Sequence, residues 1–83
     1  MHEHGLMNRL LDAATRESAA RGAALVGVTV RLGALSSSDP AHFRHEFEHV
    51  CEERGLGAIS LQIECDSDRP SGVELVSVDL AGP

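Results

Sequence analysis

Two glycines, Gly22 and Gly55, each follow a stretch with helical periodicity, and these two stops most constrain the fold. Apolar residues before Gly22 recur at the i, i+3, i+4 and i+7 spacing of one helix face, which predicts a helix over residues 5–21. Its expected buried stripe is Leu6, Met7, Leu10, Leu11 and Ala14. Because glycine readily adopts the left-handed conformation found after helices, Gly22 is expected to end this helix.

A second helix is predicted before Gly55, beginning at Asp39-Pro40 and running to about Arg54. Aspartate caps free amide groups at a helix start, and proline fits the first helical position. The expected buried stripe of this helix is Phe43, Phe47, Val50 and Cys51.

Three segments, 25–32, 59–65 and 73–80, show the alternation of β-strands. The first and second are expected to bury one face each. Those faces consist of Val26, Val28, Val30 and Leu32, and of Ile59, Leu61, Ile63 and Cys65. In the third segment Leu75 and Val76 are adjacent, which predicts a bulge or partial burial of both faces.

The predicted fold is therefore α+β, an αβαββ two-layer arrangement with two helices on a three-stranded mixed sheet. A helical crossover makes the first two strands candidates for a parallel pair, and the short polar turn at 66–72 allows an antiparallel hairpin between the second and third. Both helices are expected to cover the same face. Open strand edges also favour a homodimer or a domain swap.

Length and charge narrow the classes of function. A chain of 83 residues supports one domain, residues 1–83, with a small core. Its formal charge of -6 opposes binding to nucleic acid. The sequence contains neither a signal-peptide pattern nor an apolar run long enough for a membrane span, so a cytoplasmic protein without membrane contact is expected.

Cys51 and Cys65 are too far apart for a C-x-x-C pair and are expected to be ordinary buried or half-buried thiols.

The residues Met1-His2-Glu3-His4 offer a ligand set for a metal ion. An α-amine, the His2 imidazole and two deprotonated peptide nitrogens form the square-planar, nitrogen-rich site that suits Ni(II) or Cu(II). Removal of an initiator methionine generally requires a small second residue. Because His2 is bulky, Met1 is expected to be retained. The alternative interpretation is a frayed segment before the first helix.

Several ordered features together resemble the nickel-binding domain of the HypA/HybF family. They are Met1-His2-Glu3, the helix with Leu6, Met7, Leu10 and Leu11, the strand end Val30-Arg31-Leu32-Gly33, the turn Ser38-Asp39-Pro40 before Phe43, Phe47 and Glu48, and Gly72-Val73-Glu74-Leu75 with Val78 and Asp79. The resemblance implies a nickel metallochaperone, not an enzyme, that delivers Ni(II) to a [NiFe]-hydrogenase large-subunit precursor, or in some members to urease, together with a nickel-handling GTPase.

The same resemblance implies the roles of the ligands. His2 would be the principal side-chain ligand, completed by the Met1 amine and the backbone of His2 and Glu3. Glu3 would support the site, with a first-turn carboxylate at a helix start as the alternative. The resemblance also suggests Asp39 as an auxiliary group near the site, whereas His4 is an auxiliary candidate because it is next to the principal site in the sequence. The alternatives are a polar residue opening the helix for His4 and a helix cap for Asp39.

The chain departs from the family in one respect. Family members carry two C-x-x-C pairs that form a zinc ribbon, and this insertion is missing here between about residues 65 and 72. No zinc is therefore expected, and engagement of urease or the GTPase is placed in doubt.

The run His45-Glu46-Phe47-Glu48-His49 matches the zincin pattern and also its inverse. Helical spacing places His42, His45 and His49 opposite Phe43 and Phe47, on the solvent side, so a peptidase is not expected. A weak metal site at His45 and His49 and a solvated helix face remain alternatives. For the whole chain, the competing function is a protein-interaction module of the same fold that has lost metal delivery.

Overall fold

The computed structural model describes residues 3–33, 40–66, 68 and 72–81, and its elements follow the predicted αβαββ order. They are α1 (Glu3–Arg21), β1 (Leu25–Gly33), α2 (Pro40–Glu53), β2 (Ser60–Asp66) and β3 (Val73–Leu80). The first helix begins two residues earlier than its apolar pattern predicts.

Both helices end at the predicted glycines. Gly22 has a φ of 63° and Gly55 a φ of 71°. After α2, the Gly55 amide donates to the carbonyl oxygen of Glu52 at 3.1 Å and the Leu56 amide to that of Cys51 at 3.0 Å. This pair of bonds is the Schellman arrangement, which satisfies carbonyls left free at a helix end.

The sheet order is β2-β1-β3, so β1 is the central strand. β1 is parallel to β2, as predicted, and antiparallel to β3. The predicted hairpin between the second and third strands is therefore wrong: the chain passes to the far edge of β1, where the Gly33 amide donates to the Gly72 carbonyl oxygen at 3.0 Å. The arrangement places β1, the strand with the most buried residues, in the middle, where it has neighbours on both edges.

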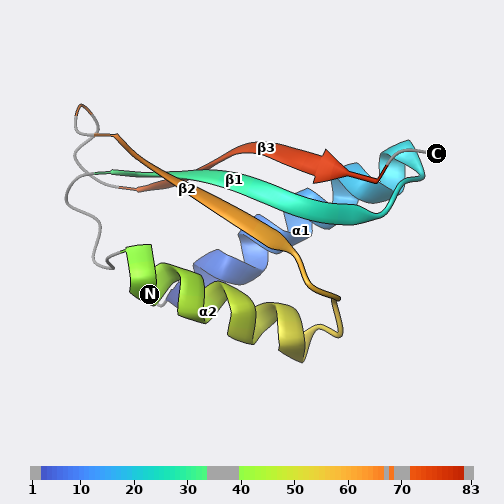
Figure 1. The fold of residues 1–83 in the computed structure, drawn as a ribbon, viewed down its shortest axis with the longest axis horizontal. Coiled ribbons are helices and arrows are strands. Elements are labelled where there is room, and N and C mark those ends of the chain that lie inside the picture. Colours follow the sequence, from blue (N-terminus) through green and yellow to red (C-terminus); the bar gives the residue numbers. More distant parts are fainter. Residues whose placement is uncertain (1–2, 34–39, 67, 69–71, 82–83) are drawn as a thin grey trace.

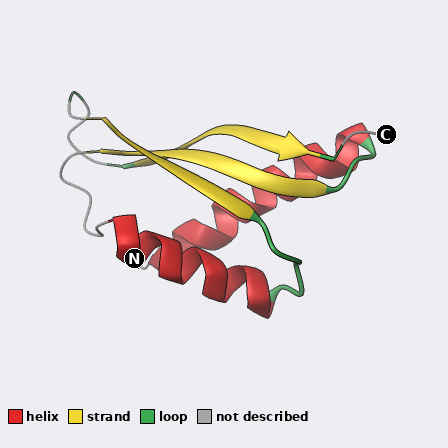
Figure 2. Ribbon diagram, in the orientation of Figure 1, coloured by secondary structure: helices red, strands yellow, loops and turns green. Residues whose placement is uncertain are grey.

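Both helices lie on the same face of the sheet, as predicted (Figure 2). Apolar side chains from both layers form a single core between them. Its buried members are Met7, Leu10, Leu11, Ala14, Val28, Val30, Leu32, Phe43, Phe47, Val50, Cys51 and Leu61. The opposite face carries charged side chains near the carboxyl end of β1, where Arg31 contacts Glu64 at 3.4 Å and Glu74 at 3.5 Å.

Two register shifts alter the predicted burial. One shift lies between Leu25 and Gly27, and Val26, which the alternation assigned to the buried side, is 43% exposed. The other accommodates Val76 opposite the Thr29/Val30 step, which confirms an irregularity in the third strand. Val76 is 39% exposed. An extra residue in one strand breaks the alternation of faces, so sequence parity no longer predicts burial beyond it.

The two cysteines differ. Cys51 is buried, as predicted, but Cys65 is exposed, so the expectation for Cys65 is wrong. Figure 1 shows the reason: the carboxyl end of β2 rises away from α2, and β2 is an edge strand. Its last residues therefore lack a helix to cover them.

Candidate functional site

Of the predicted nickel ligands and auxiliary groups, Glu3 and His4 belong to the described backbone. Met1, His2 and Asp39 lie outside the described residues, as do the side chains of Glu3 and His4. The backbone of Glu3 and His4 forms the first residues of α1. The roles predicted for all five residues therefore remain predictions.

The backbone at the start of α1 suits the predicted coordination. The first four N–H groups of an α-helix have no acceptor within the helix. The Glu3 amide belongs to this set because α1 begins at Glu3. A metal ion that binds this nitrogen would therefore remove no hydrogen bond from the helix.

The first turns of α1 are held firmly. Met7 and Leu11 are fully buried in the core. From the end of α2, Arg54 Nη1 donates to the carbonyl and Oδ1 oxygens of Asn8 at 3.3 and 3.0 Å, and Nη2 donates to Asp12 Oδ1 at 2.8 Å. The residues that follow Glu3 and His4 are thus attached to the second helix.

Sequence reasoning did not identify this role of Arg54, which it treated only as the last residue before a helix stop. A cationic side chain in that position usually interacts with its own helix end. Its contacts with Asn8 and Asp12 depend on how the two helices pack, and helical periodicity alone does not specify that packing.

The histidines of α2 lie on its solvent side, as predicted. His42, His45 and His49 are all exposed. His49 Nε2 lies 3.3 Å from Glu53 Oε2. Within residues 3–33, 40–66, 68 and 72–81, no group of three or more His, Cys, Asp or Glu residues is arranged to hold a metal ion. The zincin-like run therefore does not form a three-ligand site in the described structure.

These observations define a two-layer αβαββ domain whose three-stranded mixed sheet is covered on one face by both helices. No protein-family model and no curated protein sequence matches the chain. Among solved structures, it is similar to the solution structure of the Ni metallochaperone HypA from Helicobacter pylori, with a TM-score of 0.66 and 23% sequence identity. The similarity covers 93% of this chain and 72% of that protein and shows a HypA-like fold. None of the described helices has the length and apolar character needed to cross a membrane.

Proposed function

We propose that this protein is a nickel metallochaperone that binds Ni(II) through the Met1 amine, the His2 imidazole and the amide nitrogens of His2 and Glu3. The observation that carries the proposal is the combination of a HypA-like fold with the sequence Met1-His2-Glu3, of which Glu3 is the first residue of α1. HypA from Helicobacter pylori, which shares this fold, is a Ni metallochaperone. The proposal requires Met1 to carry a free amine.

Charge balance favours this ligand set. Two deprotonated amide nitrogens carry two negative charges, which neutralise the Ni(II) ion while the amine and imidazole remain neutral. The resulting complex has little net charge, so the positive end of the α1 dipole would not strongly repel it. Four nitrogen donors in a plane are a preferred arrangement for Ni(II). Glu3 would support the site, with His4 and Asp39 as auxiliary groups.

The proposed role is that of a carrier in the cytoplasm. The nickel would be cargo, released to a [NiFe]-hydrogenase large-subunit precursor with the help of a nickel-handling GTPase. This recipient and this partner rest on the resemblance of the sequence to the HypA/HybF family.

Titration with Ni(II) tests the proposal in the untagged protein and in His2→Ala. The expected result is a 1:1 complex with the absorption of square-planar Ni(II) in the parent protein and its loss in His2→Ala. The double variant His45→Ala/His49→Ala is the matched control, because it removes two exposed histidines from α2. It should retain the complex. Equal binding by the parent and His2→Ala would exclude the amino-terminal site.

The second candidate function is a protein-interaction module of HypA-like fold for a hydrogenase or an accessory factor, without metal delivery. An open pocket beside α2 favours this function. If neither the parent protein nor any variant binds nickel but the parent still binds a partner protein, the interaction module is favoured over the metallochaperone.

A further inference from the structure

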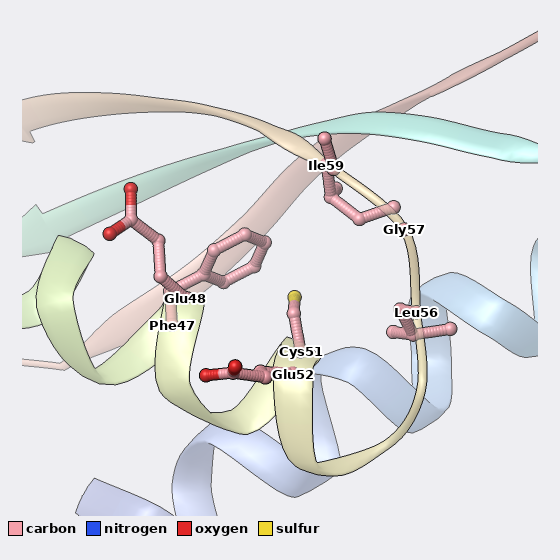
Figure 3. A pocket seen from close by; sticks show the side chains of 8 residues that line it. Phe47, Glu48, Cys51, Glu52, Leu56, Gly57 and Ile59 are labelled. Carbon is pink, nitrogen blue, oxygen red and sulfur yellow. The ribbon is translucent and has the colours of Figure 1, made fainter.

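A pocket of about 420 Å³ lies between the second half of α2 and the loop that leads to β2 (Figure 3). Phe47, Cys51, Leu56 and Ile59 form its apolar wall. In Figure 3 the Cys51 thiol points from α2 into the space that these side chains line. The volume exceeds that of a single aliphatic side chain.

The shape of this pocket is set by fixed backbone. The Schellman bonds of Gly55 and Leu56 hold the loop against the end of α2. Phe47 and Cys51 belong to the core and are only 1% and 6% exposed, whereas Leu56 and Ile59 are half-buried. A pocket whose wall is part of the core needs little rearrangement to accept an apolar group.

The rim of the pocket is negatively charged. Glu48 and Glu52 line it one helical turn apart, and both are exposed. Among the described residues, neither carboxylate forms an ion pair or accepts a hydrogen bond. The nearby cation Arg54 is instead directed toward Asn8 and Asp12. Like charges at i and i+4 repel each other, so a cation placed between them would relieve this repulsion.

We propose that the pocket binds a segment of a partner protein that inserts one apolar side chain and places a lysine or arginine beside it, against Glu48 and Glu52. The apolar wall supplies the anchor, and the two carboxylates select the basic neighbour. A second copy of this chain fits less well, because a twofold interface at this pocket would bring four carboxylates together.

A second groove, between α1 and β3, lacks this selectivity. Its lining includes Glu17 and Arg21, which already pair with each other. The charge at that groove is thus balanced, and it provides a control region for mutations.

Selection of displayed random peptides by the full chain tests the proposal, with the Cys65→Ser variant as bait. Enriched peptides are expected to carry Leu, Ile, Met or Phe next to Lys or Arg. In this variant Cys51 is the one remaining thiol. A synthetic peptide of the enriched sequence should therefore slow the reaction of Cys51 with a thiol reagent by at least about fivefold, because the thiol lies in the pocket wall.

Charge variants complete the test. Glu48→Gln/Glu52→Gln should weaken peptide binding at least about tenfold, as expected for loss of the charge-assisted contacts. Glu17→Gln is the matched control at the second groove and should bind as the parent does. Three results would overturn the proposal. They are enriched peptides without basic residues, unaltered peptide affinity in the double variant, and protection of Cys51 that comes only from self-association of the protein.

Peptide binding at the pocket does not depend on nickel binding at the amino terminus. His2→Ala is expected to bind the same peptide with unchanged affinity, and the Glu48/Glu52 variant is expected to bind Ni(II) normally. The two proposals can therefore fail separately, and the two failures give different experimental results.

Discussion

Arg54 Nη2 donates to Asp12 Oδ1 at 2.8 Å, which joins the end of α2 to the third turn of α1. The same guanidinium also contacts Asn8, and its side chain is 26% exposed. Both helices also contribute apolar side chains to the shared core. Asp12 lies about two and a half helical turns after Glu3, whose amide nitrogen is a proposed nickel ligand.

Substitution of Arg54 by alanine is expected to lower the free energy of unfolding by about 1–3 kcal/mol, because three hydrogen bonds to a charged, half-buried group are lost. Arg21→Ala is the matched control: Arg21 also precedes a helix-ending glycine, but its side chain is 67% exposed and pairs with the exposed Glu17 of its own helix. That variant should lose about 0.5 kcal/mol or less. Urea denaturation followed by circular dichroism measures both values, and equal losses would contradict the link between the helices.

Gly27→Ala is expected to destabilise the sheet. A β-carbon at this position would lie 2.9 Å from Asp79 Oδ2 and 3.3 Å from the β-carbons of Asp79 and Ser60. The crowding should lower the free energy of unfolding by about 1–2 kcal/mol.

A double-mutant cycle with Asp79→Ala provides the check, since removal of the carboxylate should recover part of the Gly27→Ala loss. Gly57→Ala is the control, because a β-carbon there meets no atom within 4 Å. Strict additivity in the cycle would exclude the clash with Asp79.

Cys51 is expected to make stability fall at alkaline pH. Burial raises the pKa of its thiol above the ordinary value of 9.0, with a smaller opposing effect from Arg54 and a smaller raising effect from Glu48. The folded chain therefore holds this proton more tightly than the unfolded chain does. The contribution of this thiol to the free energy of unfolding is fully present below the pKa of the unfolded state. It is lost as pH rises through that value toward the pKa of the folded state.

Urea denaturation at a series of pH values from neutral to about 10 measures this loss, in the range where thiols ionise. Cys51→Ala should have a flatter alkaline dependence, whatever its stability at neutral pH. Cys65→Ala, which alters an exposed thiol, should keep the slope of the parent. An unchanged slope in Cys51→Ala would show that another group controls it.

Nickel affinity is expected to fall below about pH 6.5, because imidazole must be neutral to bind a metal ion and has an unperturbed pKa near that value. Isothermal titration calorimetry across this range measures the change. Additional residues before Met1 should abolish the site at every pH by replacing the free amine with an amide. Undiminished binding at about pH 5, well below the imidazole pKa, would rule out ligation by imidazole.

The local sequence determined where the helices end and which faces they bury. The stripe Phe43, Phe47, Val50 and Cys51 is buried as its spacing predicts, and α2 ends before Gly55. These properties depend on periodicity and on the backbone freedom of one residue, both of which act over a few positions. The candidate nickel ligands were likewise found only in the sequence, since Met1, His2 and Asp39 lie outside the described residues.

The tertiary structure alone decided which edge of β1 receives β3, and with it the central position of β1. Both edges of a strand offer the same backbone donors and acceptors, so local pattern does not choose between them. Packing also decided that Val26 and Cys65 are exposed, through a register shift and through the divergence of β2 from α2. The acidic pocket at Cys51 has the same origin, because its walls come from a helix and a loop that only the folded chain brings together.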